Sequence, residues 1–167
     1  MKFFGNLSWK TFLFGILAVV WMGVIFLFSS QPAEQSTDTS HCAGRMIGSI
    51  IIWDFEQWSP EEQENFAEKI DLGVRKTAHA MEYAFLCFLI FMTFHSCGLT
   101  GKRCFGIALL MTAGYAVTDE IHQLFVPGRS GRILDILIDS AGAVVGAGAG
   151  NILVSIKKKI KHSQRLE

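Results

Sequence analysis

Residues 118–139 read TDEIHQLFVPGRSGRILDILID and join two strongly apolar segments of the chain. Carboxylates lie on both sides of a short turn that contains proline, glycine and arginine, and a histidine precedes the turn. In a membrane-spanning helix, one charge at the bilayer centre costs about 2.5–3.5 kcal/mol on insertion scales. Several ionisable residues at one depth therefore indicate a functional site between membrane-spanning helices.

The composition indicates a membrane protein. Half of the 167 residues are apolar, the mean hydropathy is +0.35 and the formal net charge is zero. This composition is too apolar for an ordinary soluble domain. The lack of an excess of basic residues argues against a nucleic-acid partner. We expect an all-α membrane protein, a single domain over residues 1–167 that forms a four-helix transmembrane bundle in a lipid bilayer. The expected spans, each of about the length that a crossing needs, are residues 11–28, 77–94, 104–125 and 133–156.

The basic residues of the connections predict the orientation, because Lys and Arg are enriched on the cytoplasmic side of membrane proteins. They lie before the first span, between the second and third spans, and after the fourth: Lys2, Lys10, Lys102, Arg103, Lys157, Lys158, Lys159, Lys161 and Arg165. We therefore expect both termini in the cytoplasm and the acidic loop, residues 29–76, outside. Arg129 and Arg132 in the outer turn depart from this rule, which indicates that partners hold them.

The long outer loop contains a helix start. Ser59-Pro60-Glu61-Glu62 places a capping serine, a proline at the first helical position and a capping-box glutamate in order. We expect a short extracytoplasmic helix that runs to about Asp71, with Gly73 near its end. This helix would lie on the outer surface or cap the bundle. The alternative is a solvated acidic loop with one weak helix.

The four-span topology brings polar residues from distant parts of the chain to the outer end of the bundle. Arg75, His79 and Glu82 are spaced by four and three residues, so they share one helix face. Asp119 lies three residues before His122 and four before Gln123, so these residues share one face of the third span. The predicted ligand-binding residues are Ser29, Ser30, Gln31, Arg75, His79, Glu82, Asp119, Glu120, His122, Gln123, Arg129, Asp135 and Asp139.

The acids of this set admit several chemistries. Asp135 and Asp139 are four residues apart, so their negative charges repel unless a cation or a bound proton offsets them. The cation could be an arginine, a protonated histidine or a divalent metal ion, for which the candidate ligands are His79, His122, Asp135 and Asp139. The candidate catalytic residues are Glu82, Asp119, Glu120 and Asp139. Arg129 is suited to capture a phosphate or carboxylate, with an ion pair to Asp135 as the alternative.

The fourth span also carries glycines at every fourth position. Gly142, Gly146 and Gly150 form a small-xxx-small face that permits close approach of another helix. We expect this face to pack, either within the chain or between copies in a homo-oligomer. A glycine-rich phosphate loop is excluded, since no Gly-Lys-Ser/Thr sequence follows.

Three stretches resemble a known family. Residues 75–83 read RKTAHAMEY, residues 118–129 read TDEIHQLFVPGR, and residues 135–146 read DILIDSAGAVVG. Together with the FSSQ end of the first span, they resemble the VanZ-like family of small bacterial membrane proteins. The resemblance implies a multi-pass protein of the bacterial cytoplasmic membrane and a link to resistance against the glycopeptide teicoplanin. It applies most directly to Glu120, Gln123, Asp135 and Asp139.

Three functions remain open at this point. The first is a protein that binds or modulates a cell-envelope component, such as a lipid-linked cell-wall precursor or the glycopeptide itself. The second is a metal-dependent or acid–base hydrolase or transferase that acts on a lipid-linked phosphate. The third is a proton-coupled carrier with buried acids as relays, against which the four short spans and the lack of a visible repeat argue.

Overall fold

A computed structural model describes residues 8–165 of the chain. Over this range the elements are α1 (Trp9–Ser29), α2 (Ala33–Ile51), a short 3-10 helix η1 (Phe55–Gln57), α3 (Pro60–Ser96), α4 (Gly101–Gln123) and α5 (Ile133–Ser163). Four of these helices, α1, α3, α4 and α5, are long and apolar enough to cross a membrane. The prediction of an all-α protein with four membrane spans is confirmed.

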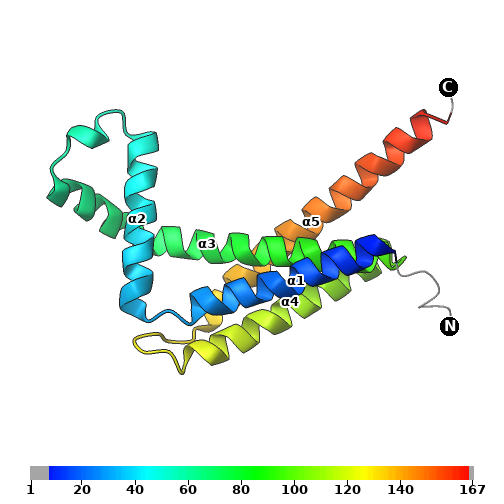
Figure 1. Ribbon diagram of the computed structural model, residues 1–167, viewed down its shortest axis with the longest axis horizontal. Helices are drawn as coiled ribbons and strands as arrows, with labels where there is room; N and C mark the ends of the chain where they lie inside the picture. The colour runs from blue at the N-terminus through cyan, green and yellow to red at the C-terminus, as the bar shows by residue number, and fades with distance from the viewer. Residues whose placement is uncertain (1–7, 166–167) are drawn as a thin grey trace.

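α3 is the central helix and packs against α1, α2, α4 and α5. α1, α3 and α4 run lengthwise along the bundle, and α5 crosses them before its last turns leave it (Figure 1). The first residues of α1 and the last residues of α5 lie at one end of the bundle. The α4–α5 turn and the α1–α2 link lie at the other, which we call the turn end. α2 stands across the turn end, so it is roughly perpendicular to the spans (Figure 1).

The capping box forms as predicted, but the helix it begins is much longer than expected. The Ser59 hydroxyl accepts from the Glu62 amide at 3.3 Å, and the Glu62 carboxylate accepts from the Ser59 amide at 2.8 Å. α3 then runs for 37 residues without a break, so the predicted end near Asp71 is wrong. A single glycine inside a helix costs only about 1 kcal/mol. The Asp71–Arg75 ion pair, four residues apart, supports the helix across Gly73.

α2 was not predicted from the sequence. The buried face of α2 consists of Ser36, Ser40, Gly44 and Gly48, which recur every fourth residue. A Cβ added at Gly44 would lie 3.1 Å from the Ala67 Cα, and one at Gly48 would overlap the Phe55 ring. α2 is therefore held by close backbone approach to α3 and η1. Its packing face carries no large apolar side chains, so the buried face gives no hydrophobic signal in the sequence.

The glycine face of α5 packs within the chain. A Cβ at Gly142 or Gly146 would overlap the main-chain carbonyl of Ala80 or Ala84 on α3, and one at Gly150 would lie 2.6 Å from the Phe91 ring. α3 and α5 therefore approach each other as closely as their backbones allow. This contact occupies the glycine face, so of the two alternatives the structure shows packing within the chain.

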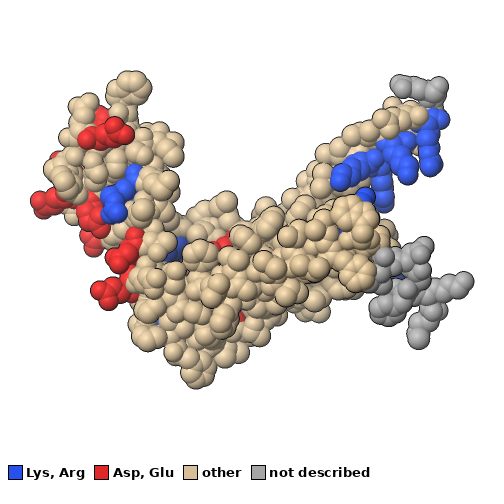
Figure 2. Space-filling model, in the orientation of Figure 1, with Lys and Arg blue, Asp and Glu red and all other residues tan. Residues whose placement is uncertain are grey.

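Apolar and charged side chains are distributed as a membrane protein requires. Large apolar residues are exposed along the spans, including Ile16 and Val20 on α1, Leu110 on α4 and Val145 on α5. A soluble monomer rarely exposes so much apolar surface, whereas a lipid bilayer covers it. Asp and Glu gather at the turn end over α2 and the first part of α3, while Lys and Arg gather along the last turns of α5 (Figure 2).

Candidate functional site

The α4–α5 turn is fixed against the link between α1 and α2. The Ala33 amide donates to the Pro127 carbonyl at 3.2 Å, and the Arg129 Nε donates to the Gln31 carbonyl at 3.2 Å. Gly128 adopts φ +73°, and a Cβ there would lie 2.9 Å from the Ala33 Cβ. Both the left-handed backbone and the close approach require glycine. These contacts give Arg129 a defined position at the turn end.

A cavity of about 160 Å³ opens beside this turn, and we call it the basic pocket. Its charged lining is Arg75, Lys76, Arg129, Arg132 and Asp135, and His79 and Gln123 also contribute. Four cationic side chains therefore face a single carboxylate. Lys76 Nζ donates to Asp135 Oδ1, which neutralises one of the four. Burial and the nearby Arg75 lower the pKa of Arg129, as expected for a cation that lacks a carboxylate partner.

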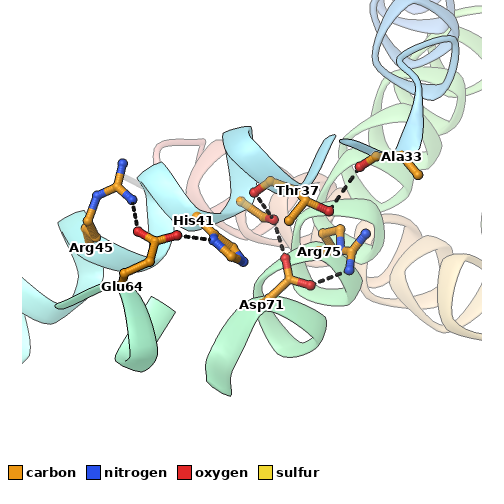
Figure 3. Close-up of polar contacts among 8 residues, drawn as sticks. Ala33, Thr37, His41, Arg45, Glu64, Asp71 and Arg75 are labelled. Carbon is orange, nitrogen blue, oxygen red and sulfur yellow. Dashed lines mark hydrogen bonds and ion pairs between the residues drawn. The ribbon is translucent and has the colours of Figure 1, made fainter. Parts of the chain in front are cut away.

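Arg75 is positioned by a polar chain that links α3 to α2 (Figure 3). The buried Asp71 carboxylate accepts from the Ser40 hydroxyl of α2 with one oxygen and from Arg75 with the other. Further along the same interface, Glu64 of α3 binds both His41 and Arg45 of α2 at 2.5 Å. α2 therefore acts as a support that sets the direction of the Arg75 side chain. Sequence spacing alone gave no sign of this interface.

A second cavity, of about 250 Å³, lies on the other side of the same cationic residues. Arg75, His79 and Arg129 line both cavities. The remaining lining comes from α1, the α1–α2 link, α2 and α3, and is mostly apolar or uncharged: Phe28, Gln31, Ser36, Thr39, Ser40, Ala43, Val74, Ala78 and Glu82. We call it the apolar cavity. Glu82 is its one acid, with Oε2 3.6 Å from His79 Nδ1.

Two aspartates are buried behind the pockets. Asp119 and Asp139 are 3% and 2% exposed. Asp119 Oδ2 accepts from the Ser29 hydroxyl at 2.8 Å and from the Gln123 amide at 3.2 Å. Asp119 Oδ1, Asp139 Oδ1 and the Tyr83 hydroxyl form no hydrogen bond with the residues described here. Asp119 thus ties the end of α1 to α4, while its Oδ1 atom and that of Asp139 have no partner among residues 8–165.

The remaining predicted residues hold the helix ends together. Glu120 accepts from the Arg132 amide at 2.7 Å and so fixes the start of α5. His122 Nε2 lies 3.0 Å from the Ser30 hydroxyl, and its ring stacks on Phe26 with centroids 4.4 Å apart. Because Ser30 gives its one proton to the Phe26 carbonyl, His122 must donate to Ser30. Neither Glu120 nor the Ser30–His122 pair lines the basic pocket.

The predicted site is therefore divided into parts. The basic pocket collects Arg75, His79, Gln123, Arg129 and Asp135 of the thirteen predicted residues. It also contains Arg132 and Lys76, which were not in the predicted set although their charge and position beside predicted residues were a usable signal. The alternative of an Arg129–Asp135 ion pair is wrong, since Lys76 takes that place. Catalytic roles for Glu82, Asp119, Glu120 and Asp139 stay predictions.

The arrangement offers no support for a metal centre. Within residues 8–165, no three His, Cys, Asp or Glu side chains converge as the ligands of an ion. Of the four suggested ligands, Asp135 is bound to Lys76 and His122 faces Ser30, on the side away from Asp135 and the basic pocket. The negative charge of Asp135 is offset by an ammonium group, which makes the metal ion unnecessary there.

These features define a polytopic α-helical membrane protein with a cation-rich pocket at one end of a four-span bundle. The chain belongs to the VanZ/LLP1 family, whose model matches residues 14–154. The match includes α2, α3 and α4, most of α1 and α5, and every residue that lines the basic pocket. Neither a curated protein nor a solved structure matches the chain.

Proposed function

We propose that the basic pocket binds an anionic group, a phosphate or a carboxylate, of a cell-envelope component. The observation that carries this proposal is the lining of the pocket, in which four cations face one carboxylate. Within the described part of the chain, carboxylates pair with Lys76 and Arg75 but not with Arg129 and Arg132. An uncompensated cation at a partly buried site is unfavourable, and a bound anion removes that cost. Arginine is well suited to this role because its planar guanidinium group can donate two parallel hydrogen bonds to a phosphate or carboxylate.

Arg129 is the residue most available for the anion. Lys76 is paired with Asp135 and Arg75 with Asp71, whereas Arg129 Nε donates to an uncharged carbonyl. Its charge is therefore not cancelled by a carboxylate. A volume of about 160 Å³ is several times that needed for one water molecule, so the pocket has room for a phosphate group.

Arg129→Gln is expected to weaken the binding of inorganic pyrophosphate at least tenfold. Loss of a charge-assisted contact to a partly desolvated anion costs about 2–5 kcal/mol, and 1.4 kcal/mol already corresponds to a factor of ten. The measurement is isothermal titration calorimetry on the purified protein in lipid nanodiscs. The matched control is Arg103→Gln, which removes an exposed cation in the first turn of α4, outside both cavities and away from the α2–α3 interface. Equal affinities for the wild type and Arg129→Gln would refute the proposal.

We further propose that the turn end lies on the outer face of the bacterial cytoplasmic membrane, with both termini in the cytoplasm. The separation of acidic and basic residues supports this orientation, because Lys and Arg collect on the cytoplasmic side. Cys42 is exposed on α2 at the turn end, while Cys97 lies next to Thr11 near the termini.

A membrane-impermeant maleimide is therefore expected to label intact cells through Cys42. Labelling should disappear in Cys42→Ser and persist in Cys97→Ser. Mass spectrometry of the labelled protein identifies the modified residue. The opposite result, in which intact cells are labelled at Cys97 alone, would reverse the orientation.

In the cell, we propose that occupation of the pocket by an envelope component modulates susceptibility to teicoplanin-like glycopeptides. Membership of the VanZ/LLP1 family supports this assignment. The pocket variant Arg129→Gln should then raise teicoplanin susceptibility to that of a strain without the gene, while Arg103→Gln should not.

A further inference from the structure

The two cavities at the turn end differ in character but share a wall. Arg75, His79 and Arg129 line the basic pocket on one side and the apolar cavity on the other. A group held by these three residues therefore has a cationic space on one side and a mostly apolar space on the other. An ion without an apolar part would make favourable contacts in the cationic space only.

The apolar cavity lies at the top of a lipid-facing strip of α3. Ala78 lines the cavity, and Met81 and Phe85 follow it along α3. All three are exposed, and their spacing of three and four residues places them on one helix face. The Phe85 ring also meets Trp21 of α1 edge-on, with centroids 4.9 Å apart. A hydrocarbon chain that leaves the cavity would therefore continue along apolar side chains into the bilayer.

The charged residues of the two cavities determine which cavity favours the anionic end of a ligand. Glu82 is the only acid that lines the apolar cavity, and it lies on the side of His79 away from the basic pocket. Glu82 carries no positive charge in either protonation state, so it gives an anion no charge attraction toward the bilayer. Lys76 and Arg132 line the basic pocket alone, so the cationic charge is greater on that side. The distribution of charge thus favours the head of a ligand in the basic pocket and its tail in the apolar cavity.

We infer that the ligand of this site is an amphiphile: a lipid whose phosphate lies in the basic pocket and whose hydrocarbon chain passes between Arg75 and Arg129 into the apolar cavity. This inference rests on the proposed function and narrows it. The shared chemistry is the phosphate, which a soluble ion also carries. A lipid differs from a soluble phosphate in the additional affinity that its hydrocarbon chain contributes.

The test compares ethyl phosphate with octyl phosphate on the full-length protein in nanodiscs, with binding to empty nanodiscs subtracted. Octyl phosphate is expected to bind at least tenfold more tightly, because each buried methylene group adds to affinity. Ala78→Leu fills the apolar cavity and should remove this difference while leaving the affinity for ethyl phosphate unchanged. Ala141→Leu, at an exposed position of α5 outside both cavities, should leave both affinities unchanged.

Two results would overturn the inference. If ethyl and octyl phosphate bind equally and Arg129→Gln weakens both, the site takes soluble anions and the proposed function stands without the lipid. If octyl phosphate binds tightly and Arg129→Gln does not lower its affinity, the octyl chain binds without any contribution from the basic pocket. Failure of pyrophosphate and both alkyl phosphates to bind would overturn the proposed function as well. A thermal melt of Ala78→Leu that matches the wild type excludes misfolding as the cause of a change.

Discussion

Gly146→Ala is expected to force α3 and α5 apart and to lower the melting temperature substantially. The added Cβ would overlap the carbonyl of Ala84, and a main-chain carbonyl inside a helix cannot rotate away as a flexible side chain can. Overpacking of a well-packed core costs about 1–3 kcal/mol, and more when the backbone must move. Thermal unfolding of the purified protein in a fixed detergent, followed by intrinsic tryptophan fluorescence, measures the effect.

Gly148→Ala provides the matched control for this prediction. Gly148 lies two residues away on α5, and a Cβ there would meet nothing within 4 Å. Because alanine is favoured over glycine inside a helix by about 1 kcal/mol, the control should melt at the wild-type temperature or above it. If both variants lost the same stability, close packing of the glycine face would not be the cause.

Lys76→Met is expected to destabilise the turn end because it leaves Asp135 without its cation. The two side chains are 26% and 19% exposed, and the pair joins α3 to the start of α5. Removing one partner of a fully buried pair costs about 3–5 kcal/mol, so a loss of about 1–3 kcal/mol is expected for this partly exposed pair. The same thermal unfolding measurement applies, and hydrogen exchange of the first turn of α5 locates the effect.

The double variant Lys76→Met/Asp135→Leu separates the ion pair from the individual side chains. Replacement of both charges by apolar groups of similar size is often neutral, so the double variant should be more stable than Lys76→Met alone. This double-mutant cycle yields the coupling between the two residues. Losses that simply add would show that Lys76 stabilises the protein independently of Asp135.

Much of the fold could be predicted from the sequence because the spans carry a strong apolar signal. All four expected spans correspond to helices of the structure, and the capping box at Ser59 was identified from four residues. The errors have a physical origin. α2 packs through serine and glycine, which carry no hydrophobic signal, and Gly73 alone was too weak a reason to end a helix that Asp71 and Arg75 support.

The sequence indicates which end of the bundle holds the candidate site, but not which side chains pair with each other there. Helical spacing correctly grouped Arg75 and His79 on one face, and both line the basic pocket. Spacing within one helix does not give the rotation of that helix relative to its neighbours. For that reason the sequence could not reveal that Asp135 pairs with Lys76, or that His122 faces Ser30.

The uninterrupted course of α3 has a mechanical consequence. At 1.5 Å per residue its 37 residues extend about 56 Å, well beyond the roughly 30 Å of bilayer hydrocarbon. α2 is bound to the part of this rod before Gly73, and Arg75 projects from the same rod one turn beyond Asp71. A force applied to α2 is therefore transmitted to Arg75 along a continuous helix, with no flexible loop between them. Lateral pressure at the membrane surface would then be coupled directly to the width of the basic pocket.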